Sequence, residues 1–142
     1  MGGILKYSLK RPDLKAFEAR AGGELAHVAS GGGLNWGLRG AINVPLVTDK
    51  LAIRISAYNR ETAGYLDNIG IGRENSNSRR PTGGRVAIRL APSDRFHIEA
   101  SVLAQRIRSA DSSAVTLVGQ TGEPAYGRYT RSTKFAETYA QD

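Results

Sequence analysis

The chain has 142 residues, of which 40% are hydrophobic and 23% charged, and this is ordinary for one folded domain. Twenty Lys and Arg residues outnumber 13 Asp and Glu residues, but the basic residues are spread along the chain and form no cluster with interleaved aromatics, so we expect no nucleic-acid partner. The absence of cysteine excludes disulfides, thiolate metal sites and cysteine nucleophiles.

Alternating patterns predict an all-β chain. Seventeen glycines and scattered Pro, Asn and Asp separate short runs of period two, whereas helical spacing and apolar runs of transmembrane length are absent. The N-terminus also lacks the apolar stretch of a secretory signal. Strands are expected at 4–10, 15–26, 34–47, 51–60, 83–91 and 95–106, with the start of one more after 127.

The connections between these strands alternate in length. Short turns are expected at 48–50 and 92–94, a medium connection at 26–33, and long loops at 61–82 and 107–127. In an antiparallel meander, every second connection lies at the same end of the sheet, and outer-membrane barrels have short turns at one end and long loops at the other. Strands of roughly 9 to 13 residues also suit a tilted crossing of a bilayer. The fold class predicted is an antiparallel meander of about six long strands, part of a transmembrane β-barrel.

The two faces of the predicted strands differ in chemistry. Aliphatic side chains share one face and charged side chains the other, as expected where one face meets lipid and the other a wet lumen. The predicted lipid-facing residues are Trp36, Leu38, Ile42, Ile53, Ile55, Val86, Ile88, Phe96 and Ile98, with Trp36 suited to an aromatic girdle. The predicted lumen-lining residues are Arg20, Arg39, Arg54, Tyr58, Arg89 and Glu99.

The alternative is a soluble or secreted all-β binding or adhesion module. Its apolar faces would pack together as a two-layer sandwich, which gives the same alternation along each strand. The strand lengths and the unequal loops favour the membrane interpretation.

Three longer stretches of the chain carry a more specific signal. GGILKYSLKRP at 2–12 resembles the end of the plug domain of TonB-dependent outer-membrane receptors, where the chain passes to the barrel. GAINVPLVTDKLAIRISAYNRETAGYLDN at 40–68 is similar to early barrel strands, and TGGRVAIRLAPSDRFHIEASVLAQR at 82–106 to the next hairpin. The resemblance implies that 1–13 end a plug domain and linker, and that 14–142 are an incomplete N-terminal part of the barrel.

The resemblance also implies a function and partners. Such a receptor sits in the bacterial outer membrane and imports a scarce small molecule, such as a ferric siderophore, cobalamin or a glycan. Its partners would be outer-membrane lipid, the plug and remaining strands of the receptor, and the TonB complex, which acts only through the plug. Since a full receptor has 22 strands, the chain is expected to be a fragment of one.

Candidate sites lie in the lumen and the outer loops. The first long loop offers Tyr65, Asp67, Asn68 and Arg73 as ligand contacts, although loop polarity alone predicts the same composition. The arginines of the charged face line a polar lumen or, alternatively, form a path for an anionic substrate. We expect no enzyme, catalytic residue, cofactor or metal: His27 and His97 lack partner ligands, and the glycines at 31–33 and 83–84 do not lead from a strand into a helix, as phosphate loops do.

Overall fold

The computed structural model describes residues 9–29, 32–93, 95–119, 121–127, 129–134 and 136–141. Among these residues, no helix is long and apolar enough to cross a membrane. Their strands are β1 (Glu18–His27), β2 (Leu34–Val47), β3 (Leu51–Glu61), β4 (Asp67–Asn68), β5 (Arg79–Ser93), β6 (Phe96–Ser109), β7 (Thr130–Arg131) and β8 (Tyr139–Gln141).

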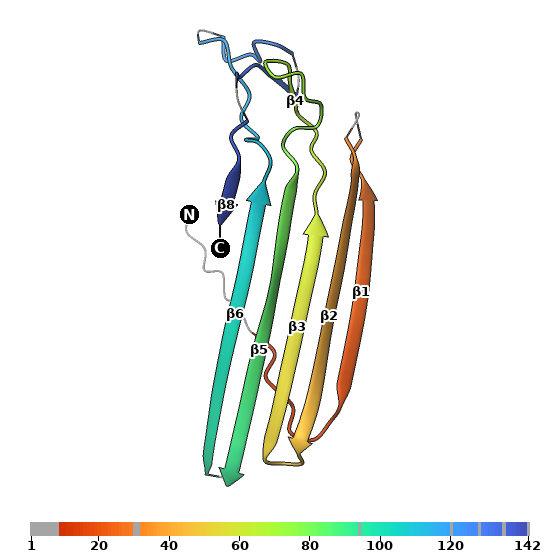
Figure 1. The fold of residues 1–142 in the computed structure, drawn as a ribbon, viewed down its shortest axis with the longest axis vertical. Coiled ribbons are helices and arrows are strands. Elements are labelled where there is room, and N and C mark those ends of the chain that lie inside the picture. The colour runs from red at the N-terminus through yellow and green to blue at the C-terminus, as the bar shows by residue number, and fades with distance from the viewer. Residues whose placement is uncertain are drawn as a thin grey trace. The chain divides into compact units, whose positions relative to one another are not determined.

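Six of these strands form one antiparallel sheet, which confirms the all-β prediction. Their order is β1-β2-β3-β5-β6-β8, and consecutive long strands are neighbours, as in a meander (Figure 1). The short strand β8 pairs antiparallel with the end of β6, from Ile107 opposite Gln141 to Ser109 opposite Tyr139. A separate parallel pair joins β4 to β7.

Strand bounds follow the sequence pattern most closely where the alternation is longest. β2 has the predicted bounds, and β1, β3 and β6 differ from prediction by a few residues. β5 begins at Arg79, so residues 79–82 form a strand, whereas a loop was predicted there. Most of the strand predicted at 4–10 lies outside the described residues, and residues 9 and 10 are not in a strand. After residue 127, where the start of one more strand was predicted, the described residues form β7 and β8, and β8 joins the sheet beside β6.

The chain divides into two compact units. Unit 1 comprises Met1–Arg20, Ala41–Ser56 and Arg85–Leu103, and unit 2 comprises Ala21–Gly40, Ala57–Gly84 and Ala104–Asp142. The short connections of the sheet, 48–50 and 94–95, belong to unit 1. The longer ones, 28–33, 62–78 and 110–138, belong to unit 2. The predicted alternation of connection lengths is confirmed.

Burial in unit 1 is reversed relative to a protein with an apolar core. The side chains removed from solvent lie on the charged face of the strands: Asn43 and Ala52 are 0% exposed, Ala87 is 2% and Arg54 is 8%. On the opposite face of the same strands, aliphatic side chains such as Ile55 and Val86 remain exposed. Unit 1 therefore buries part of its polar face, on β2, β3 and β5, whereas its apolar face is partly or fully exposed.

The segment before β1 covers this polar face. Asn43 accepts a hydrogen bond from the Asp13 amide at 2.9 Å and donates to the carbonyls of Asp13 at 3.0 Å and Ala16 at 2.7 Å. Arg85 donates to the Lys10 carbonyl at 2.9 Å. These bonds join residues 10–16 to β2 and β5, which explains why small and polar side chains beneath the segment are buried.

Candidate functional site

Charged side chains on the polar face of unit 1 are paired around Glu18. The Glu18 carboxylate accepts hydrogen bonds from Lys10 Nζ at 2.6 and 2.8 Å and from Arg54 Nη1 at 3.0 Å. Arg20 forms a further ion pair with it. The predicted lumen residues Arg20 and Arg54 thus meet at one carboxylate.

A second ion-pair group lies on the same face at Glu99. Its two carboxylate oxygens lie 3.3 Å from Arg11 Nε and 3.5 Å from Arg89 Nε. Two of the predicted lumen residues, Arg89 and Glu99, are therefore brought together, and Arg11 joins them from the segment before β1. Together the two groups join two carboxylates to five basic side chains, so this part of the face keeps a net positive charge.

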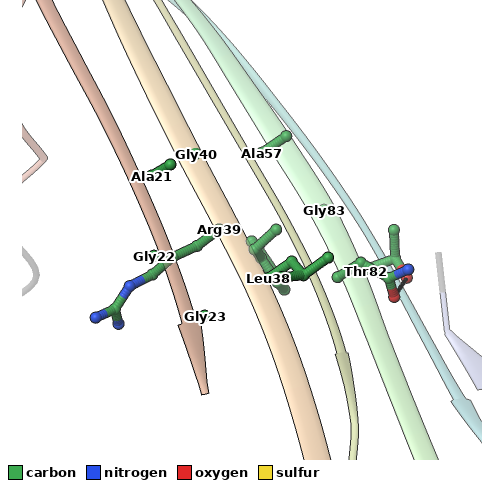
Figure 2. Close-up of a pocket in the computed structure, with 11 residues that line it drawn as sticks. Ala21, Gly22, Gly23, Leu38, Arg39, Gly40, Ala57, Thr82 and Gly83 are labelled. Atoms are coloured by element: carbon green, nitrogen blue, oxygen red, sulfur yellow. Dashed lines mark hydrogen bonds between the residues drawn. The ribbon is translucent and has the colours of Figure 1, made fainter. Parts of the chain in front are cut away.

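The polar face of unit 2 holds the remaining two predicted lumen residues. Tyr58 Oη donates a hydrogen bond to Gln105 Oε1 at 2.8 Å, which links β3 to β6. Arg39 extends from β2 across β1 beside Gly22, on the side away from Leu38 (Figure 2). A Cβ on Gly22 would lie 3.1 Å from Arg39 Nε, so the glycine leaves room for the arginine side chain.

A shallow open hollow of about 780 Å³ lies in unit 2 (Figure 2). Its lining is mainly glycine and alanine, for example Ala21, Gly23, Gly40 and Ala57. Small side chains lower the surface of the sheet there and account for the hollow. We assign no ligand to it.

The predicted lipid-facing residues are exposed. Leu38, Ile42, Ile55, Val86, Ile88, Phe96 and Ile98 are between 37% and 63% exposed. Trp36 and Ile53 are partly exposed. In a two-layer sandwich these side chains would pack against a second sheet, but the strands of the described residues form only the six-stranded sheet and the two-stranded pair.

The long connections of unit 2 pack against each other. β4 lies parallel to β7, with Asp67 opposite Thr130 and Asn68 opposite Arg131. The rings of Tyr65 and Tyr129 meet edge to face, with centroids 5.7 Å apart. The first predicted loop and the chain after 127 are therefore parts of one folded substructure.

A buried polar network holds these loops together. Asp111, 1% exposed, accepts from Arg131 Nη1 and Asn68 Nδ2, both at 3.1 Å, and Arg131 is itself only 3% exposed. The side-chain amide of Asn68 also donates from Nδ2 to Thr133 Oγ1 at 2.7 Å, and its Oδ1 accepts from the backbone N–H of Thr133 at 3.1 Å. This buried ion pair and its hydrogen bonds join the two loops, although Arg131 Nε is buried without a hydrogen-bond partner.

The four predicted ligand-contact residues of the first loop fall into different environments. Asn68 is 0% exposed, and its side-chain amide donates hydrogen bonds to Asp111 and Thr133 within the loop network. Tyr65 is 39% exposed and Arg73 is exposed. Asp67 is partly exposed and accepts from the Asn75 amide at 2.9 Å. Of the four, Tyr65 and Arg73 present the most surface to a ligand.

Sequence reasoning missed Asp111 and Arg131. Both lie in a stretch without alternation, and their partner Asn68 is 43 positions from Asp111 along the chain. The one signal was the concentration of Asn and Asp in the first loop, since these residue types hydrogen-bond nearby backbone groups.

Gly70 marks a close approach of the two loops and supports a stability prediction. A Cβ at this position would lie 2.2 Å from the Thr133 carbonyl oxygen, a backbone atom that cannot move alone. We expect Gly70→Ala to destabilise the loop substructure by about 1–3 kcal/mol, as overpacking does. Limited proteolysis of the folded chain measures the effect.

Gly119→Ala is the matched control for Gly70→Ala. No atom lies within 4 Å of a Cβ built at Gly119 in the second connection. Equal cleavage rates for both variants and the parent chain would contradict the close approach at Gly70.

The ionisation of Asp111 makes the loop structure sensitive to acid. Burial raises the pKa of Asp111, but hydrogen bonds from the Glu137 amide, the Asn68 side chain and the Ser112 amide, with Arg131 nearby, outweigh it and hold the pKa below its usual 3.8. A lowered folded-state pKa means that this stabilisation is fully present above the unfolded value, near 3.8, and is lost as the pH falls through the folded-state pKa.

Amide exchange measures this pH dependence. The amides of Asp67 and Ile69 donate to the carbonyls of Tyr129 and Arg131, both at 2.9 Å, so their protection reports the β4–β7 pairing. Corrected for the intrinsic rate, protection should be constant from neutral pH down to about 4 and decrease in stronger acid. Protection that increases on acidification would show that Asp111 is not a stabilising carboxylate.

No group of three or more His, Asp or Glu residues that could hold a metal ion occurs in the part of the chain that the structure describes. Comparison with known protein families, with characterised proteins and with solved structures finds no match to this chain.

Proposed function

We propose that this chain is part of the β-barrel of a TonB-dependent outer-membrane receptor, which takes up a scarce small molecule such as a ferric siderophore, cobalamin or a glycan. The observation that carries the proposal is the reversed burial of unit 1. Part of its charged face is paired and buried, whereas its aliphatic face is partly or fully exposed.

The exposed face has the composition that lipid requires. Across unit 1, the side chains that share this face on β2, β3, β5 and β6 are uncharged, from Ile42 to Leu46, Leu51 to Ile55, Val86 to Leu90 and Phe96 to Val102. Contiguous exposed apolar surface is unfavourable in water and marks a membrane or protein interface. A charged side chain at the bilayer midplane costs about 2–4 kcal/mol, which accounts for the absence of charge on this face.

Two further features agree with a barrel wall. The short connections belong to one unit and the long ones to the other, as in outer-membrane barrels. The segment before β1 lies on the polar face of unit 1, the side on which a plug would lie in the receptor family that the sequence resembles.

In this proposal, import belongs to the complete receptor. The edge strands β1 and β8 would pair with further strands of the barrel, because an unpaired edge exposes backbone hydrogen-bonding groups. The present chain alone should not restore substrate uptake in a strain that lacks the receptor. Restored uptake would contradict this division of roles.

Solubility and folding in detergent test the membrane assignment. The purified full chain should be insoluble in plain buffer and should become soluble, with a strand-type circular dichroism spectrum, in detergent micelles. A monomeric chain that is soluble in buffer and unfolds in one sharp transition would refute the proposal and favour the soluble adhesion module.

A further inference from the structure

Residues 10–16, before β1, cross the polar face of unit 1, and we call them the strap. Besides the hydrogen bonds to β2 and β5 given above, the Leu14 carbonyl accepts a hydrogen bond from the Asp49 amide at 3.0 Å. Near the start of the strap, Arg11 forms its ion pair with Glu99. The strap is therefore attached to β2, to the turn after β2, to β5 and to β6.

Asn43 on β2 makes the most contacts with the strap. Its side chain is 0% exposed, and it uses one acceptor and both N–H groups of its amide on the strap, at distances from 2.7 to 3.0 Å. The partners are backbone atoms of Asp13 and Ala16, and Pro12 next to them is fully buried. By contrast, the basic side chains of the ion pairs at the start of the strap are 51% and 70% exposed, so solvent screens them.

We propose that Asn43 is an anchor residue that fixes the strap to the sheet, so that the strap opens only when the sheet itself unfolds. In the receptor, the strap would be the fixed end of the plug, and movement of the plug during import would stop at the strap; this role rests on the proposed function. Hydrogen bonds to backbone atoms suit a fixed end, because they hold the path of the chain itself.

Amide exchange of the folded full chain in detergent micelles tests the anchor. The Asp49 amide, bonded to Leu14, reports the strap, and the Ala91 amide, which donates to the Lys50 carbonyl at 2.7 Å, reports the sheet. In the parent chain, both amides should be equally protected and respond equally to denaturant. In Asn43→Ala, protection of Asp49 should fall about 100-fold below that of Ala91, because each of the three lost hydrogen bonds contributes roughly a factor of five.

Asn35→Ala is the matched control. Asn35 lies on the same face of β2 as Asn43, but its Oδ1 accepts from the Ala63 amide at 2.6 Å, in unit 2. This variant should keep the ratio of Asp49 to Ala91 protection at the parent value. High salt, which screens exposed ion pairs, should also keep it. A loss in high salt as large as in Asn43→Ala would overturn the anchor, because the ion pairs would then hold the strap.

Asp13→Ala carries the test if Asn43→Ala does not fold. Asp13 is exposed, and its Oδ1 accepts from the amides of Lys15 at 2.8 Å and Ala16 at 3.1 Å, so the carboxylate shapes the strap without contributing to the sheet. Loss of these two bonds should lower the protection of the Asp49 amide by about 10-fold or more relative to that of Ala91. An unchanged ratio would overturn the anchor.

Further outcomes separate the anchor from the proposed function. An Asp49 amide that exchanges faster than Ala91 in the parent chain, or equal protection of the two amides in Asn43→Ala, would overturn the anchor and leave the receptor proposal standing. A chain that is monomeric and soluble in plain buffer would refute the receptor and the plug role of the strap. The same exchange measurement in that buffer would still decide whether Asn43 fixes the strap.

Discussion

Val102→Arg should strongly destabilise the chain in a bilayer. Val102 lies near the middle of β6 on the apolar face and is 73% exposed. In lipid, an arginine at this depth is expected to reduce the free energy of unfolding by about 2–4 kcal/mol, a factor of roughly 30 to 1,000 in the folding equilibrium. Denaturant titration of the chain in lipid vesicles measures the loss.

Ser101→Arg is the control. Ser101 is next to Val102 in β6, so it would lie at nearly the same depth in the bilayer, but its side chain is on the opposite face of the strand. Ser101 is also exposed, so no packing is lost there. We expect a change below about 1 kcal/mol for this variant, since a face directed to a wet lumen would tolerate charge. If the chain were a water-soluble protein, both exposed sites would change stability by only about 0.5 kcal/mol, as surface substitutions do. Equal effects of the two variants would therefore contradict a lipid-facing Val102.

Asp111→Asn should unfold the loop substructure. The variant leaves Arg131, 3% exposed, without its nearest carboxylate, and the remaining ion pair to Glu137 is longer, at 3.5 Å. Removing one partner of a buried ion pair costs about 3–5 kcal/mol. Exchange protection of the Asp67 and Ile69 amides should therefore decrease by about 100-fold or more, unless global unfolding limits it first.

Two variants test whether this loss comes from an unpaired buried charge. Glu123→Gln, at an exposed position in the same connection, should leave protection unchanged. Arg131→Gln added to Asp111→Asn should recover part of the loss, because the uncompensated charge is then gone. If the double variant is destabilised by the sum of the two single variants, the network does not act as a coupled pair.

The strands were predictable because apolar and polar side chains alternate along them with a period of two. At 34–47 the alternation lasts through the whole of β2, and the observed bounds are the predicted ones. The start of β5 was not predictable, because RRPT at 79–82 is polar and contains Pro81. This start of β5 nevertheless pairs with the end of β3 and the residue after it. Thr62 and Arg79 exchange two backbone hydrogen bonds of 2.8 Å, beyond the apolar part of both strands.

For the charged face, the sequence predicts which charged residues share the face but not which of them form ion pairs. Alternation places Arg54 and Arg89 on the same face as Glu99, but it does not show that Arg54 pairs with Glu18 from β1 or that Arg11 reaches Glu99. The loop substructure could not be predicted. It depends on contacts such as that of Asn68 with Thr133, 65 positions apart, in segments whose apolar residues follow no regular spacing.

Trp36 fluorescence in bilayers tests the central claim that the apolar face contacts lipid. Trp36 is the sole tryptophan, and it shares a face of β2 with Leu34 and Leu38, which are 55% and 63% exposed. With the chain folded into vesicles that contain brominated acyl chains, Trp36 should be strongly quenched, whereas a tryptophan placed by Ser56→Trp on the polar face of a Trp36→Phe chain should not. Unquenched Trp36 in the folded chain, or equal quenching at the two positions, would contradict the assignment of this face to lipid.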